Sequence, residues 1–336
     1  MSKSTLVPAR NAIHGTGRAK LVGFGTTASF AELSYTYPLK LLSPRQTTAT
    51  NIERLAILYN LSYGGGLIGG DQLALTLELG SDVKLLFLTQ GSTKIFPSRA
   101  RPRLATGRAE VGDTRQRLSA TIGSGACLVM LPDPVTPFSH SSYSQVQIFR
   151  LAAPTKDTAG GSIVLLDWFT SGRMSRGEEW QFDRYRSANE IWIGNERVAS
   201  DVLLLEQPPS SSSVDETAKK INRLRDSLAP YACYATLLLF GPATHALSKE
   251  FAQRYDGLSQ MQRKVPEDLI WSYSPLEYKT SINNGKRNSG QKETGVGAIV
   301  RVAAKDTESV RQWLRESLRA GLEAQIGRNA YSKAFV

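Results

Sequence analysis

The sequence predicts a mainly β fold with a few helices, one of them at the C-terminus. Many short apolar segments alternate with turn-forming residues, one segment has an apolar period of two, and helical periodicity is confined to the last third. The 336 residues are 41% hydrophobic and 21% charged, which is typical of a globular protein with a large core. No run approaches the roughly 20 apolar residues that a membrane helix needs.

The clearest strand covers residues 71–79, where four leucines alternate with polar or small residues. Turn-forming residues 80–82 follow, and residues 83–88 form a second, nearly all-apolar strand, so we expect the two to pair as a hairpin. Further strands are predicted at residues 117–122, 127–131, 144–151, 162–169, 190–193, 201–205, 235–240 and 298–303. Residues 163–166 are apolar on both faces, which indicates strands covered on both sides.

Helices are expected at residues 218–228, at residues 244–255 and after residues 306–308. In the last of these, apolar residues recur at spacings of three and four, namely Val310, Trp313, Leu314, Leu318, Leu322 and Ile326. We expect a flexible N-terminal tail over residues 1–19 and a single domain over residues 20–330. A Pro/Ser linker at residues 208–216 and a basic loop at residues 281–294 lie within that domain.

The net charge of +11 raises the question of nucleic acid binding. The basic residues are spread along the chain apart from two loops, at residues 97–117 and 281–294, and neither loop interleaves them with aromatic residues. An acidic protein partner explains the charge equally well. Cys127 and Cys233 lie in apolar strand-like segments, so we expect buried free thiols, and no secretory signal precedes them. These features predict a cytoplasmic protein.

Glycine-rich and polar turns come next to the predicted strands. The glycines of residues 64–70 lead into a strand and lack the closing Gly-Lys-Ser/Thr of a phosphate-binding loop, so they predict a tight structural turn. Residues 88–96 crowd hydroxyl, amide and ammonium groups into one turn. They either line a cavity or bond their own backbone, and the sequence leaves both open.

Carboxylates also follow apolar strands. Asp133 lies between two prolines and Asp167 follows residues 164–166. A buried carboxylate is costly unless it is paired or hydrogen-bonded, and Arg173 is a candidate partner for Asp167. Glu178 and Glu179 could act on a sugar as acid and base or belong to a salt-bridge network. The three histidines have no catalytic or zinc-ligand spacing, so no catalytic residue is predicted.

These segments together resemble the UreD family of urease accessory proteins. The matching segments are YPLKLL (37–42), GGLIGGD (65–71), TQGSTK (89–94), LPDPV (131–135), DWFTSGR (167–173) and RGEEW (176–180). Their order and spacing also match, and the resemblance covers residues 20–330. It implies a β-helical body, no enzymatic activity, and no tightly bound cofactor. It also implies binding of apo-urease on one side and a UreF-type protein on the other, which recruits the UreG-type GTPase that carries nickel.

The resemblance further implies that carboxylates and polar turns line a route for the nickel ion. A conduit needs exchangeable oxygen ligands, because a tight His/Cys site would arrest the ion. The candidates for this lining are Asp71, Asp133, Asp167 and Glu178, with Ser92 and Lys94 as its polar wall.

Two other functions compete with this interpretation. A carbohydrate-active β-helix enzyme would turn over substrate alone, using two close carboxylates in an open cleft. A nucleic-acid-binding module, suggested by the charge, would show steeply salt-dependent binding.

Overall fold

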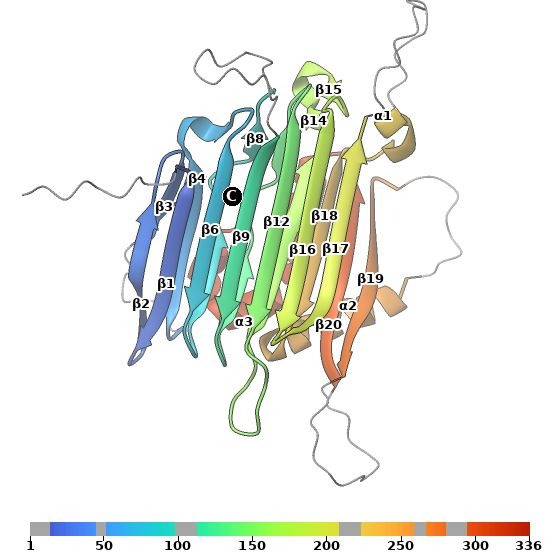
Figure 1. The fold of residues 1–336 in the computed structure, drawn as a ribbon. Coiled ribbons are helices and arrows are strands. Elements are labelled where there is room, and N and C mark those ends of the chain that lie inside the picture. The colour runs from blue at the N-terminus through green and yellow to red at the C-terminus, as the bar shows by residue number, and fades with distance from the viewer. Residues whose placement is uncertain (1–13, 45–51, 98–112, 208–222, 259–266, 280–293) are drawn as a thin grey trace, which may run out of the picture.

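A computed structural model describes residues 14–44, 52–97, 113–207, 223–258, 267–279 and 294–336. Two large β-sheets face each other, and helices cover the outer face of only one of them (Figure 1). The mainly β class predicted from the sequence is confirmed. Within these residues, no helix is both long enough and apolar enough to cross a bilayer.

We call the sheet without helices the open sheet. Its strand order is β17-β16-β12-β9-β6-β1-β2. The strands are β1 (Thr16–Phe24), β2 (Thr27–Tyr35), β6 (Gln72–Leu79), β9 (Thr114–Ile122), β12 (Ser142–Leu151), β16 (Arg184–Ile193) and β17 (Glu196–Glu206).

The other sheet is called the covered sheet, with the order β19-β20-β18-β13-β10-β7-β4-β3. Its strands are β3 (Leu39–Leu42), β4 (Leu55–Ser62), β7 (Lys84–Leu88), β10 (Cys127–Met130), β13 (Ser162–Thr170), β18 (Cys233–Phe240), β19 (Leu269–Lys279) and β20 (Thr294–Ala304). Short strands β5 (Gly66–Leu67), β8 (Thr93–Ile95) and β11 (Val135–Pro137) extend it, and β14 (Gly172–Arg173) pairs with β15 (Glu178–Glu179).

The helical elements are short except for two. They are η1 (Tyr63–Gly65), η2 (Met174–Arg176), α1 (Arg223–Leu228), η3 (Pro242–Thr244), α2 (His245–Asp256), α3 (Thr307–Ile326) and α4 (Arg328–Tyr331). The predicted C-terminal helix is confirmed as α3. Its N-cap is Asp306, whose side chain accepts a hydrogen bond from the Ser309 amide, and Val310, Leu314 and Leu318 are buried.

In the centre of the molecule the chain alternates between the two sheets. It passes from β4 to β6, β7, β9, β10, β12, β13 and β16, and each strand lies parallel to the previous one in its own sheet. The flanking strands pair antiparallel, as β1 does with β2 and β16 with β17. The central strands are therefore parallel within each sheet, as is the pair of β1 and β6, whereas the outermost pairs are antiparallel.

The predicted hairpin at residues 71–88 is wrong. β6 pairs with β1 and β9 in the open sheet, whereas β7 pairs with β4 and β10 in the covered sheet. Residues 80–82 therefore form a corner between the sheets. The corner places Leu77 and Leu85 in the same core between the two sheets, where both side chains are removed from water.

Two hydrophobic cores result from this arrangement. One lies between the sheets and includes Leu77, Phe87 and Phe149, and the other lies between the covered sheet and helices α2–α4. β13 is buried on both faces, as predicted, because it separates the two cores. Cys127 and Cys233 are free and buried, also as predicted. Lys84 at the start of β7 donates a 2.9 Å hydrogen bond to the carbonyl oxygen of Gln325 in α3.

Several predicted boundaries can be compared with the structure. β1 begins at Thr16, inside the segment expected to be a flexible tail, and residues 1–13 lie outside the described ranges. The linker at residues 208–216 and nearly all of the basic loop at residues 281–294 also lie outside them, as do residues 98–112. Gly64 and Gly65 have φ of 79° and 72°, in agreement with the predicted tight turn.

Candidate functional site

Polar side chains lie inside the sandwich, where the strand pattern of the open sheet places them. Gln145 is in register with Gln116 of β9 and with Ser187 of β16, so the three form one row across the sheet. Gln147 and Asn189 form the next row. Gln145, Gln147, Ser187 and Asn189 are all buried. An interior of this kind needs internal hydrogen bonds, because an unpaired buried polar group is costly.

Asp167 of β13 faces these rows from the covered sheet. Its carboxyl accepts hydrogen bonds from Gln145 Nε2 at 3.2 Å, Ser187 Oγ at 2.5 Å and Asn189 Nδ2 at 2.7 Å. Burial raises the pKa of Asp167, and the three hydrogen bonds oppose that increase. The predicted ion pair between Asp167 and Arg173 is wrong. Arg173 of β14 instead pairs with Glu178 of the neighbouring strand β15. Neutral donors therefore hold Asp167.

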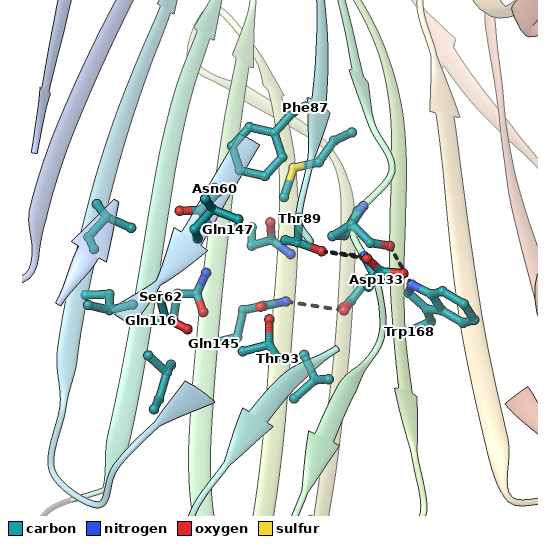
Figure 2. A pocket seen from close by; sticks show the side chains of 18 residues that line it. Asn60, Ser62, Phe87, Thr89, Thr93, Gln116, Asp133, Gln145, Gln147 and Trp168 are labelled. Carbon is teal, nitrogen blue, oxygen red and sulfur yellow. Dashed lines mark hydrogen bonds between the residues drawn. The ribbon is translucent and has the colours of Figure 1, made fainter. Parts of the chain in front are cut away.

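Two cavities meet at Asp167. The smaller has a volume of about 50 Å³ and lies between the sheets, where Gln145, Gln147 and Asn60 help to line it (Figure 2). The larger has a volume of about 410 Å³ and is lined by aromatic and polar residues of β13, β16, β17, β18, β19 and β20. Arg301 and Asp201 form a 2.7 Å ion pair across the larger cavity, which joins β20 to β17.

Some oxygen atoms around these cavities are available to a ligand. Among the residues that the structure describes, Asn60 Oδ1 at the smaller cavity and the Tyr185 hydroxyl at the larger one are buried without a hydrogen-bond partner. Unsatisfied buried polar atoms are rare in proteins and often mark sites of function. The arrangement offers amide, hydroxyl and carboxyl oxygens to a small cation.

Asp133 also lines the smaller cavity, from the loop after β10. Its carboxylate accepts hydrogen bonds from the Gly91 amide at 2.9 Å and from the Thr89 hydroxyl at 3.4 Å. Arg311 of α3 contacts the same carboxylate at 3.2 Å, and both side chains are more than 80% buried. Figure 2 shows Thr89, Asp133 and Trp168 on one side of the cavity. Asp133 thus connects the polar turn of residues 88–96 to the C-terminal helix.

Comparison with known proteins identifies the family of this chain. A model of the family described as UreD urease accessory protein matches residues 15–335. The chain belongs to the UreD family. Urease accessory protein 4 of Cryptococcus neoformans is 35% identical over 100% of both chains. Urease accessory protein D of Arabidopsis thaliana is 30% identical over 94% of this chain and 99% of its own length. Urease accessory protein UreD of an Anaeromyxobacter strain is 30% identical over 95% of this chain and 89% of its own.

In this UreD-family chain, the structure brings two of the six candidate lining residues to a cavity. Asp133 and Asp167 line the smaller one. Asp71 instead accepts a 2.9 Å hydrogen bond from the Ile68 amide within its own turn. Ser92 and Lys94 lie on the polar turn without lining either cavity, although Thr93 between them lines the smaller one. Thr89 and Thr93 of that turn line the smaller cavity, and the Thr89 hydroxyl also donates a 3.5 Å hydrogen bond to the Gly91 carbonyl oxygen within the turn, so both interpretations apply in part.

Glu178 is held in a salt bridge away from both cavities. Its carboxylate accepts from Arg173 Nε at 2.7 Å, and the Arg173 guanidinium lies 4.1 Å from the Phe138 ring centroid. Arg173 lowers the pKa of Glu178. A general acid on a sugar needs a raised pKa, so this geometry favours the salt-bridge interpretation of Glu178.

The glutamines and the asparagine facing Asp167 were not predicted from the sequence. Gln145 and Gln147 alternate with Val146 and Ile148, and that pattern predicts amides on the solvent side of the strand. The burial shows the reverse orientation, with both amides inside. In the part of the UreD-family chain that the structure describes, His, Cys, Asp and Glu form no cluster of three or more suited to a metal ion.

Proposed function

We propose that this chain is a non-catalytic scaffold for urease maturation. It binds apo-urease and, with a UreF-type protein and a UreG-type GTPase, helps to deliver nickel to the urease active site. Membership of the UreD family supports the role in urease maturation. The observation that supports a route for the ion is the position of Asp167 between two cavities of unequal size. The free, buried thiols support a reducing compartment, so we assign this activity to the cytoplasm.

The two cavity volumes suit different states of the cation. The cavity of about 410 Å³ has room for an ion with its water shell. The cavity of about 50 Å³ has room for a few water molecules and is too small for an ion with its complete water shell. An ion in the smaller cavity therefore needs protein oxygens in place of water. We expect the Asp167 carboxylate and the amide oxygens of Gln116, Gln145 and Gln147, which line this cavity, to supply them. The Gln116 and Gln145 oxygens now accept hydrogen bonds from the Tyr143 hydroxyl, which the ion would replace.

The surroundings of Asp167 support passage rather than storage. Burial raises the pKa of its carboxyl, so protons compete with a divalent cation for Asp167 more strongly than for an exposed aspartate. Neutral amides and hydroxyls complete the lining, and oxygen ligands of this kind bind nickel more weakly than histidine or cysteine do.

The first experiment measures the nickel content and activity of urease purified from a strain that lacks this gene. We expect abundant urease with little nickel and little activity. Fully active, nickel-loaded urease would contradict the whole proposal. Complementation with the wild-type gene should restore both nickel content and activity.

The route is tested in the same strain with variants at limiting nickel. Asp167→Asn removes the carboxylate, and Gln147→Leu replaces an amide on the cavity wall with an apolar side chain. We expect each to reduce the nickel content of urease severalfold while the chain remains soluble. Asp157→Asn is the matched control, because Asp157 is exposed in the loop before β13. Wild-type nickel content with both cavity variants would exclude the route and leave the scaffold role intact.

A further inference from the structure

The outer face of the open sheet carries apolar side chains that no described element covers. All described helices longer than eight residues pack on the covered sheet, so this face is open in Figure 1. The inverted pattern of β12 contributes to it. With Gln145 and Gln147 inside, Val146 and Ile148 point outward.

The apolar side chains form a continuous patch across three strands. Val146, Ala188 and Val202 are in register across β12, β16 and β17, and Ile148 and Leu204 lie in the adjoining rows. We call these five residues the apolar stripe. Val202 is 57% exposed and Leu204 49%, whereas Ala188 is 3% exposed between its larger neighbours. Contiguous exposed apolar surface of this kind on a folded protein usually marks an interaction site.

Three arginines surround the apolar stripe. Arg117 is in register with Val146, and Arg115 and Arg186 flank Ser144 on its two sides. Arg115 and Arg117 are exposed, and Arg186 is half-buried. Within the described ranges, none of the three has a carboxylate within 4.0 Å. They leave a positive charge next to an apolar surface.

The acidic residues of the same face are already engaged by other cations. Glu78 pairs with Arg18, Glu206 with Arg184, and Glu190 with Arg197. A partner therefore meets unpaired positive charge at the apolar stripe and balanced charge around it. Arginine is enriched at protein interfaces, and such charges steer an oppositely charged partner to its site.

We propose that the apolar stripe, with Arg115, Arg117 and Arg186, is a docking surface for an acidic protein partner. The partner places apolar side chains on the stripe and carboxylates opposite the three arginines. The surface lies on the outer side of the open sheet, and of its eight residues Val202 alone also borders a cavity, the larger one. The choice of apo-urease as the probe rests on the proposed function.

The test measures binding of the full-length chain to immobilised apo-urease at low and high salt. Arg115→Glu/Arg117→Glu/Arg186→Glu should lower the association rate constant about tenfold or more at low salt and remove most of its salt dependence. Val202→Asp should increase the dissociation rate constant about tenfold or more, because a charge would be buried against an apolar partner surface. Leu204→Ser provides a milder second change on the same stripe.

Matched controls are available away from this face. Arg315→Glu/Arg319→Glu reverses charges on the exposed side of α3, and Leu258→Asp changes a residue that is 45% exposed after α2. Both controls should bind as the wild-type chain does. Wild-type binding by the triple-arginine and Val202 variants would overturn the docking surface while the scaffold role stands. Failure of the wild-type chain to bind apo-urease would overturn both proposals.

Discussion

Asp167 and Ser187 lie on strands of opposite sheets, and the Ser187 hydroxyl donates a 2.5 Å hydrogen bond to the Asp167 carboxyl across the interior. Gln145 and Asn189 donate to the same carboxyl. In the described part of the chain no cation is paired with it, so the pKa of Asp167 depends on burial, on these neutral donors and on the charge of Asp201. The interior of this sandwich is thus polar at the point where the two cavities meet.

Replacing Asp167 with asparagine should change how stability depends on pH. Because burial raises the pKa of Asp167 above its unfolded value, the stabilising contribution of its neutral form is complete below the unfolded pKa and is lost as pH rises through the folded pKa. Asparagine does not titrate. The difference in Tm between Asp167→Asn and the wild-type chain should therefore shift in favour of the variant as pH increases from 4 to 8. A difference that stays constant over this range would contradict the raised pKa.

Breaking the contact between Asp133 and Arg311 should loosen the C-terminal helix. Both side chains are largely buried, and Asp133→Ala also removes the acceptor for Gly91 and Thr89. We expect a loss of about 2–4 kcal/mol in the free energy of unfolding and faster hydrogen exchange in α3. A double-mutant cycle with Arg311→Ala should give a coupling energy of about 1–3 kcal/mol. A coupling energy near zero would show that the ion pair does not hold the helix.

Removing the cap of α3 should have a smaller effect. Asp306→Ala should reduce the free energy of unfolding by about 1 kcal/mol, because the Ser309 amide loses its acceptor. Asp306→Asn keeps a side-chain oxygen that can cap the helix, so it should reduce the free energy of unfolding by less than Asp306→Ala does. The Ser309 amide lowers the pKa of Asp306, so the contribution of the carboxylate is present above the unfolded pKa and is lost as pH falls through the folded value. Urea unfolding at pH 7 and pH 3 measures both effects, and equal losses for the two variants would argue against the cap.

Both thiols should resist modification in the folded chain. Burial raises the pKa of Cys127 and of Cys233 to about 12, and each side chain is at most 2% exposed. The thiolate is the reactive form, so a disulfide reagent at pH 8 should label neither thiol in native protein and both in guanidinium chloride. Rapid labelling of either thiol without denaturant would show that its core opens readily.

The sequence predicted strands well where burial alone determines the pattern. The apolar segments at residues 127–131, 162–169 and 235–240 correspond to β10, β13 and β18. Strand pairing was not predictable in the same way, because residues 80–82 suit a corner between sheets as well as a hairpin. β6 pairs with β9, which begins 35 residues after β6 ends. Which strands pair with each other depends on the apolar surfaces that the whole sandwich buries.

The site was predicted only in part, for a physical reason. Asp133 and Asp167 could be predicted because a carboxylate beside a buried strand needs a partner. The partners of Asp167 could not, since β12 places its glutamines inside and its branched apolar side chains outside. Alternation identifies two faces of a strand without saying which one is buried. Here a polar interior and an apolar outer face both depart from the usual orientation.

The hydrogen bond from Lys84 to Gln325 has a consequence for synthesis of the chain. It joins residues 241 positions apart, and it connects β7 to a helix that is synthesised after every described strand of both sheets. Until α3 emerges, the outer face of the covered sheet, which includes Leu86, Val129 and Leu166, lacks the cover of α3 and α4, and α2 alone can pack on it. A nascent chain therefore exposes part of an apolar face during most of translation, when aggregation competes with folding. Truncation before residue 307 should leave the area under α3 and α4 permanently exposed and yield an insoluble product.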